Sequence, residues 1–365
     1  MRYMWMILFL MLPLAGLAYV GWHVWTLTPL SRLWRTVIIF FGVASFMLLF
    51  LNLSRTIDRF PLWLGRLCYD IGNSSIFVLL YLVITFLVLD AGRLLHIVPR
   101  EWLHQNFHTA AAVTLGIFVV FLMGNIHYRH KVRMTMDINT AKTLSKPLRL
   151  VALSDLHLGY HNPRKELARW VDIINAEQPD MVLIAGDIID ISVRPLVEED
   201  MAQEFRRIKA PVYACLGNHE YYTGEPLAQQ FYRDAGIHLL QDSSTLAGDL
   251  LIIGRDDRTN TRRKPLGELC TKTSELRTRF TIVLDHQPYH LEEAERLGID
   301  LQLSGHTHRG QVWPISWITD RIYECAWGPW QRGNTRYYVS SGIGIWGGKF
   351  RIGTQSEYLV VTISN

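Results

Sequence analysis

Apolar runs of strand length, each followed at once by acidic, amide or imidazole side chains, constrain this 365-residue chain more than any other feature. Because the carboxyl ends of strands in an α/β sheet meet at one edge, such side chains are expected to converge there. The runs are bounded by polar or turn residues and cover residues 150–153, 181–185, 212–216 and 281–284. The pattern predicts an α/β fold with a polar site along one sheet edge.

Five short segments supply the side chains of that site. They are Ser154-Asp155-Leu156-His157, Gly186-Asp187-Ile188-Ile189-Asp190, Gly217-Asn218-His219-Glu220, Asp285-His286-Gln287-Pro288 and Gly305-His306-Thr307-His308. Mixed nitrogen and oxygen ligands without thiolate suit Mn²⁺, Fe²⁺ or Zn²⁺, of which we favour Mn²⁺. Two such ions need a bridging carboxylate, and Asp187 at a strand end is the expected bridge. Each segment alone also fits a turn, a helix cap or a surface loop, but the five together predict a two-metal hydrolytic site.

Strands and helices alternate from residue 147 onward. Helices are predicted over 165–177, 198–209 and 227–235, and later strands over 250–254, 280–284, 301–305 and 337–341. This alternation indicates layered sheets flanked by helices.

The five segments resemble, in order and spacing, the motifs of the calcineurin-like metallophosphoesterases, over about residues 148–364. The resemblance is strongest to a bacterial membrane-attached branch, whose last motif continues as GHTHGGQ, and here Arg309 stands where that branch has glycine. The resemblance implies a calcineurin-like two-sheet α/β sandwich. It also implies hydrolysis of a phosphoester by in-line attack of water at phosphorus.

The resemblance further implies a role for each site residue. One metal would be held by Asp155, His157, Asp187 and His308, and the other by Asp187, Asn218, His286 and His306. His219 would stabilise or protonate the leaving group and would be oriented by Asp190, since a carboxylate on the far ring nitrogen raises the pKa of an imidazole. Arg309 would add a cation beside the substrate phosphate and so affect substrate preference.

The first third of the chain is far more apolar than the rest. Four stretches approach the roughly 20 residues that cross a bilayer, at residues 4–27, 36–53, 75–89 (or 75–95) and 109–126. Asp90 and Arg93 interrupt the end of the third, so three or five spans are alternatives. The predicted domains are a transmembrane anchor of about four helices over 1–130, a basic linker over 131–147 and a metallophosphoesterase domain over 148–365.

Lysine and arginine give the orientation of this anchor, because they concentrate in cytoplasmic loops. One side carries eight, Arg2, Arg55, Arg59, Arg66, Arg129, Lys131, Arg133 and Lys142, and the other carries four, Arg32, Arg35, Arg93 and Arg100. The count predicts that both termini lie on the inner side of the membrane, with the catalytic domain in the cytoplasm. The resemblance implies that this is a bacterial inner membrane. A cleaved signal peptide and a transport role are alternatives, but the first run continues past any small-residue cleavage site and no span carries a run of charges.

The expected substrate is a phosphodiester or diphosphate linked to a lipid. Four features favour it: the anchor, the basic linker, the cation-rich residues 255–279 and the late tryptophans Trp313, Trp317, Trp327, Trp330 and Trp346. The cations also fit a solvated loop, and such tryptophans more often cover a core. Related enzymes of the superfamily cleave UDP-2,3-diacylglucosamine, which makes a nucleotide–lipid diphosphate the specific expectation.

Two other functions are also consistent with this sequence. One is a phosphatase or phosphodiesterase for soluble nucleotides or phosphoproteins, and the other is a membrane sensor without turnover. A net charge of +4 is too small to suggest nucleic acid as a partner. Four widely spaced cysteines do not suggest a disulfide framework.

Overall fold

The chain divides into two compact units, a helical unit of Met1–Ile126 with Gly347–Lys349 and a catalytic unit of His127–Trp346 with Phe350–Asn365. The computed structural model describes residues 2–271, 276 and 278–365.

Four long helices occupy the four apolar stretches of the sequence. They are α1 (Arg2–Leu27), α2 (Arg32–Leu53), α3 (Leu62–Leu94) and α4 (Phe107–Arg129). Among the described residues, α2, α3 and α4 are long and apolar enough to cross a membrane.

Helix α3 starts at Leu62 and continues past Asp90, where the sequence suggested an interruption. The Asp90 carboxylate accepts a hydrogen bond from the Tyr19 hydroxyl at 2.7 Å and lies 3.1 Å from His23 Nε2. A polar group between apolar helices is tolerated when a neighbouring helix supplies its partners. Asp90 is therefore a contact between α1 and α3 rather than a helix end.

The catalytic unit contains two six-stranded sheets. The first has the order β1-β12-β2-β3-β4-β5 and the second the order β10-β11-β9-β8-β7-β6. In chain order the strands are β1 (Lys131–Asn139), β2 (Leu148–Leu153), β3 (Met181–Ala185), β4 (Val212–Cys215), β5 (His238–Leu239), β6 (Ser243–Ala247), β7 (Leu250–Gly254), β8 (Phe280–Leu284), β9 (Leu301–Ser304), β10 (Gly328–Arg332), β11 (Thr335–Val339) and β12 (Ser356–Ser364). Strands β2 to β5 run parallel, and so do β7, β8, β9 and β11.

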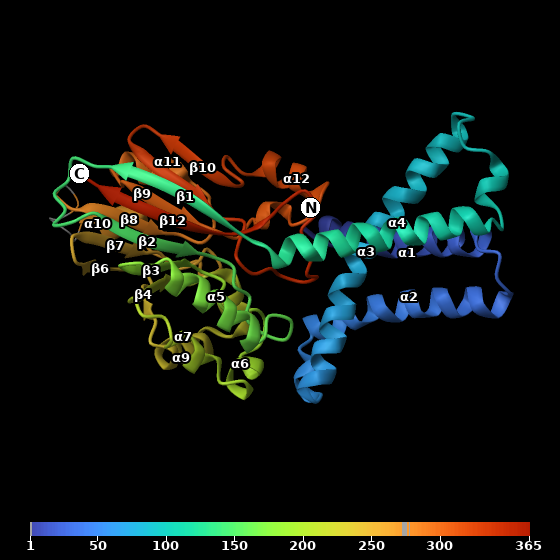
Figure 1. Cartoon of the computed structure of the whole chain (residues 1–365), viewed down its shortest axis with the longest axis horizontal. Helices are drawn as coiled ribbons and strands as arrows, with labels where there is room; N and C mark the ends of the chain where they lie inside the picture. Colours follow the sequence, from blue (N-terminus) through green and yellow to red (C-terminus); the bar gives the residue numbers. More distant parts are fainter. Residues whose placement is uncertain (1, 272–275, 277) are drawn as a thin grey trace. The chain divides into compact units, whose positions relative to one another are not determined.

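The sheets face each other, and helices cover their outer faces. Side chains alternate along β2, so Leu150 joins the core between the sheets while Val151 joins the core under the helices. Helices α5 (Arg164–Ala176), α7 (Met201–Phe205) and α9 (Glu225–Ala235) pack on the first sheet, and Figure 1 shows them together along one side of the strands. Helices α10 (Leu266–Thr271) and α11 (Leu291–Arg296) pack on the second. The predicted two-sheet α/β sandwich is confirmed.

The structure corrects two local expectations. Lys131–Asn139, predicted to open a basic linker, form strand β1, which pairs in parallel with β12 from Lys131↔Ser356 to Asn139↔Ser364. Alternate residues of β1, such as Met136 and Ile138, pack into the core between the sheets, so an apolar face is hidden among basic residues. The helix predicted over 198–209 is broken, because Asp200 has a left-handed backbone (φ 53°) between α6 (Arg194–Glu198) and α7.

Candidate metal centre

The predicted site residues lie in loops that follow the carboxyl ends of strands in both sheets. Asp155 and His157 follow β2, Asp187 and Asp190 follow β3, Asn218 and His219 open α8 (Asn218–Thr223) after β4, His286 follows β8, and His306 and His308 follow β9. All except His306 and His308 are buried, and those two are half-buried. The structure brings these nine side chains together.

Left-handed backbone conformation is concentrated in these loops. Five of the predicted ligands have positive φ, namely Asp155 (54°), His157 (45°), Asp187 (53°), His306 (71°) and His308 (46°). For a non-glycine residue this conformation costs roughly 1–2 kcal/mol. Such strain persists where the surroundings over-determine the conformation, which is typical of functional sites.

Glycines make room for the two central carboxylates. A β-carbon at Gly217 would overlap the Asp187 carboxylate, and one at Gly305 would overlap the Asp155 carboxylate. Only glycine lets the neighbouring backbone approach the acidic groups this closely. The glycines of the sequence segments therefore have a steric role in the site.

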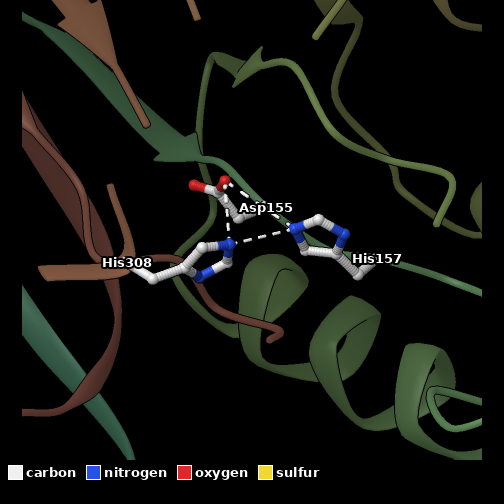
Figure 2. Close-up of side chains that lie close together, drawn as sticks. All are labelled: Asp155, His157 and His308. Carbon is white, nitrogen blue, oxygen red and sulfur yellow. Dashed lines mark hydrogen bonds and ion pairs between the residues drawn. The ribbon is translucent and has the colours of Figure 1, made fainter. Parts of the chain in front are cut away.

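Asp155, His157 and His308 form the first ligand group, shown in Figure 2. His308 Nε2 lies 3.5 Å from Asp155 Oδ1 and 3.1 Å from His157 Nε2. The backbone N–H of His306 donates to both oxygens of Asp155, at 3.0 and 3.2 Å, and so holds the carboxylate in place. Burial and the neighbouring His157 lower the pKa of His308 well below its usual value, so this imidazole is neutral.

Several lone pairs in this group face one another with no proton between them. His157 Nδ1 lies 3.2 Å from Asp190 Oδ1, which places the proton of a neutral ring on Nδ1 and leaves a lone pair on Nε2. That lone pair points into a space shared with His308 Nε2, with Asp187 Oδ2 at 3.6 Å and with Asp155 Oδ1 at 3.9 Å. Within the described part of the chain, buried His308 Nδ1 has no hydrogen-bond partner. A cation in that space would be a partner for Nε2 of both histidines and for the two carboxylates, so the residues fit a metal ion.

Asp187, His286 and His306 form the second ligand group. His286 Nδ1 lies 2.8 Å from the carbonyl of Ala185, which leaves Nε2 toward Asp187 Oδ2 at 3.1 Å. Asn218 Oδ1 lies 3.1 Å from His286 Nε2 and 2.8 Å from His306 Nδ1, so the amide joins the group. The same Oδ2 of Asp187 faces both groups, as a bridging ligand would. The metal-by-metal assignment stays a prediction.

The pKa values of this second group differ in a way that suits metal binding. Burial alone would lower the pKa of His286, but the Asp187 carboxylate outweighs it and raises the pKa well above its usual value. Burial and the charge of His286 lower the pKa of His306 to about 4. In the metal-free site a proton on His286 therefore takes the place that a cation would occupy, while His306 is a neutral ligand.

Asp190 contacts two imidazoles rather than one. Its carboxylate lies 3.2 Å from His157 Nδ1 and 3.3 Å from His219 Nδ1, and its backbone carbonyl lies 2.9 Å from His219 Nδ1. Both rings are thus fixed with Nδ1 toward Asp190, so Nε2 of His157 faces the first ligand group and Nε2 of His219 points away from Asp190. This geometry suits the predicted role of His219 on the leaving group, and that role stays a prediction.

Two buried charged residues, to which the sequence pattern assigned no role, hold the backbone of the ligand loops by hydrogen bonds. Glu220 accepts hydrogen bonds from the backbone N–H groups of Gly217 (2.7 Å), Ile189 (3.0 Å) and Asp187 (3.1 Å), and so ties two ligand loops together. Arg351 donates to the backbone carbonyl of His308 at 2.8 Å. Glu220 had a sequence signal, since a glutamate at the third position of a helix typically caps its amino end. Arg351 lies far from the five segments and had none.

Arg309 turns toward an aromatic ring. Its guanidinium carbon lies 4.2 Å from the ring centroid of Trp327, whose indole N–H donates to the buried Glu357 carboxylate at 2.9 and 3.0 Å. The backbone of Arg309 is left-handed (φ 48°, ψ 39°), which explains why glycine suits this position in the resembling branch. Among the described residues, no hydrogen bond or ion pair joins the Arg309 side chain to the ligand groups, so its action on substrate stays a prediction.

The cation-rich residues 255–279 divide into structural and surface groups. Arg255 Nη1 lies 3.0 Å and Arg263 Nη2 2.8 Å from Asp285 Oδ2, so two of these cations neutralise the buried residue that precedes His286. Arg258 is exposed and stacks on Tyr289, with its guanidinium carbon 4.6 Å from the ring centroid. Lys272 and Arg277 lie outside the described residues.

Comparison with known proteins agrees with this geometry. Residues 148–310 match the family model described as calcineurin-like phosphoesterase. This catalytic unit contains a calcineurin-like phosphoesterase domain. Members of that family are metal-dependent hydrolases of phosphoesters, so the predicted enzyme class is confirmed.

Relatives of this calcineurin-like phosphoesterase occur in bacteria and animals. An uncharacterized metallophosphoesterase of Campylobacter jejuni is 29% identical over 256 residues, which cover 69% of this chain and 68% of the relative. A transmembrane protein with metallophosphoesterase domain from Danio rerio is 27% identical over 355 residues, 90% of this chain and 79% of the relative. A metallophosphoesterase of Helicobacter pylori is 30% identical over 218 residues, and the aligned part is only 59% of its length. Together with the three apolar helices, these relatives indicate that the phosphoesterase associates with a membrane.

Bound divalent cations supply Lewis-acid chemistry in such sites, because they activate water and neutralise charge on the phosphoryl group. The chain's own residues provide two groups of ligands, a carboxylate that faces both, and an imidazole fixed beside them. The identity of the metal stays a prediction.

Proposed function

We propose that this phosphoesterase hydrolyses a phosphodiester or diphosphate bond of a lipid-linked substrate at the surface of the membrane that holds its helices. A nucleotide–lipid diphosphate is the favoured class. One observation carries the proposal: the chain enters the catalytic unit at the sheet edge that bears the metal ligands.

The strand register gives the position of this entry point. Helix α4 ends at Arg129 and β1 begins at Lys131, with His130 alone between them. Lys131 pairs with Ser356 at the start of β12. Strand β12 runs antiparallel to β2 and reaches it near its carboxyl end, where Leu359 pairs with Ala152, three residues before Asp155.

This entry point limits how far the metal centre can be from the bilayer. A long flexible linker would allow the domain to act anywhere within reach, whereas a single residue between an apolar helix and a strand allows little separation. A site at that edge would meet headgroup phosphates directly. A soluble substrate would gain nothing from this arrangement.

The test compares two substrates with the same headgroup. Full-length protein in proteoliposomes with Mn²⁺ should hydrolyse a membrane-embedded nucleotide–diacylglycerol diphosphate at least about tenfold more efficiently in kcat/KM than the same headgroup without acyl chains. Asp187→Ala should abolish both activities, because it removes the carboxylate that faces both ligand groups. Equal efficiency on the two substrates would sink the lipid-linked proposal and leave the phosphoesterase assignment standing.

The catalytic unit is proposed to lie on the cytoplasmic side. Arg129 ends α4, and Lys131 and Arg133 follow it closely, as cations do on that side of a membrane. A reporter that is active only in the periplasm, fused after Asn365, should be silent. Reporter activity there would reverse the orientation.

A further inference from the structure

We propose that helix α12 (Ile315–Ile322) rests in the lipid interface and docks the metal edge of the catalytic unit on the membrane surface. This inference rests on the proposed function, because it names the surface by which the catalytic unit would reach a lipid-linked substrate. The ligand of this surface is a lipid bilayer.

Helix α12 presents an exposed apolar face in the part of the catalytic unit that the structure describes. Trp317, Ile318 and Ile322 are 65%, 57% and 60% exposed, whereas Ser316 on the opposite face is 6% exposed. Trp313, just before the helix, is 37% exposed and stands edge-to-face with Trp317, with ring centroids 5.4 Å apart. We call these four side chains, Trp313, Trp317, Ile318 and Ile322, the α12 face. The late tryptophans were expected to cover a core, and for Trp313 and Trp317 that expectation is wrong.

The chemistry of the α12 face suits a lipid interface. Tryptophan is enriched where a membrane meets water, because its ring is apolar and its N–H is polar. At 100° per residue, Arg321 falls between Trp317 and Ile318 on the same side of the helix, and it is exposed. An arginine there can extend its cation to lipid phosphates while its stem stays among the apolar side chains.

Hydrogen bonds connect the α12 face to the start of β1, where the chain enters the catalytic unit. The backbone N–H of Trp313 donates to the carbonyl of Ile352 at 2.7 Å, and Val312 bridges to Ile352. The Arg351 guanidinium contacts Ser356, which pairs with Lys131. Figure 1 shows α12 at the end of the sheets where β1 begins. The end of α4 and the α12 face therefore lie at one edge of the catalytic unit.

The same backbone joins the α12 face to the metal ligands. His308 opens the short η4 turn (His308–Gly310), and α12 begins only five residues after that turn. Arg351 donates to the His308 carbonyl and so links this turn to the Ile352 side of the face. Contact of α12 with lipid would hold the ligand loop at headgroup depth.

Position-specific fluorescence tests the contact. The native cysteines Cys68, Cys215, Cys270 and Cys325 are buried, so a thiol-reactive fluorophore should report a cysteine introduced into the otherwise unchanged full chain. Labels at Trp317→Cys and Ile322→Cys in proteoliposomes should be quenched by lipid-borne spin labels and shielded from aqueous iodide. The matched control is Val197→Cys on α6, where the wild-type side chain is 71% exposed, and its label should show the reverse.

Two outcomes would overturn the proposal. If labels at 317 and 322 reach iodide as readily as the label at 197, the α12 face points to water. If they are shielded from both quenchers, protein covers the face, either other helices of the chain or a second copy.

An activity measurement separates this inference from the proposed function. The double variant Trp317→Ser with Ile318→Ser should lose about tenfold in kcat/KM on the membrane-embedded substrate. It should keep its activity on soluble bis(p-nitrophenyl) phosphate, which shows that it is folded, and Val197→Ser should be normal on both. If lipid quenches the α12 labels but the wild type does not prefer the membrane-embedded substrate, the docking is upheld and the lipid-linked substrate is refuted. If the wild type prefers the embedded substrate but lipid does not quench the labels, only the docking is refuted.

Discussion

Arg351, a fully buried side chain, donates a hydrogen bond to the backbone carbonyl of His308 at 2.8 Å. Its other donors reach the Ser356 hydroxyl at 3.2 Å and the carbonyls of Ser341 and Gly344. Burial lowers the pKa of Arg351 to about 10, while Glu357 opposes this change, so the guanidinium stays charged at neutral pH. One buried cation therefore fixes the backbone of a predicted metal ligand from behind.

Arg351→Lys should weaken metal binding without touching any ligand. Lysine cannot reproduce the forked donors, so His308 should lose its fixed position, and metal affinity should fall about 10–100-fold. Calorimetric titration of the metal-free protein measures this. Arg206→Lys, at an exposed arginine that donates to the Asp234 carbonyl, is the control and should bind metal normally. Unchanged affinity in a folded Arg351→Lys protein would contradict the positioning role.

His219→Asn should remove turnover while metal content stays unchanged. Loss of a group that acts on the leaving group costs about 10²–10⁴-fold in kcat, and elemental analysis should still find the metals of the wild type. Loss of metal together with activity would instead make His219 a ligand.

The pH profile of the wild type should depend on the same residue. Burial alone would lower the pKa of His219, but Asp187 and Asp190 outweigh it and raise the pKa to about 9. Bound cations neutralise Asp187 and remove part of this effect. Because the predicted role of His219 on the leaving group requires a protonated imidazole, kcat should fall as pH rises through a value no higher than about 9. His219→Asn should lack this alkaline limb.

Metal binding should release protons at neutral pH. Asp187 keeps a proton on His286 in the metal-free site, and a cation must displace it, so apparent affinity should rise with pH. Titration in two buffers of different ionisation enthalpy counts the protons. His286→Ala should release fewer. An equal heat in both buffers for the wild type would refute this account.

Glu177→Gln should loosen strand β1 from the rest of the sheet. Glu177 Oε1 accepts from Arg133 Nε of β1 at 2.7 Å, and hydrogen bonds from Arg133 hold the pKa of this carboxyl at about 2, below the usual 4.5. Because the pKa of Glu177 is lower in the folded state, its carboxylate stabilises the folded state above pH 4.5. This contribution to stability is lost as the pH falls toward 2. The variant should lose about 1–3 kcal/mol at neutral pH and show a flatter acid limb in thermal melts. Asp172→Asn, which breaks the exposed pair with Arg207, should change little.

The sequence predicted the strands that precede the ligand loops and the nine side chains that the structure brings together there. Each run that precedes a ligand loop became a strand within a residue or two, because a continuous apolar run bounded by turn residues has few alternatives. The convergence of Asp155 and His308, more than a hundred and fifty residues apart, also followed from strand ends alone.

Other features depended on tertiary contacts that no local pattern reveals. Strand β1 alternates apolar and polar side chains, but its basic residues and its place next to an apolar helix suggested a linker. Asp90 continues α3 because Tyr19 and His23, on a different helix, satisfy it. Composition cannot show that Trp317 is exposed, because this depends on what packs beside α12. It also cannot show that Arg255 and Arg263 form ion pairs with the buried Asp285.

The continuity of α4 with β1 has a practical consequence for fragments of this protein. Because β1 is the outermost strand of its sheet, a catalytic fragment that starts at residue 148 would leave nine-residue β12 as the new edge. That edge would carry unpaired backbone groups along an apolar strand, a ready template for intermolecular pairing. A soluble version should therefore be cut before β1 rather than after it, and its new amino terminus would then lie beside the metal site.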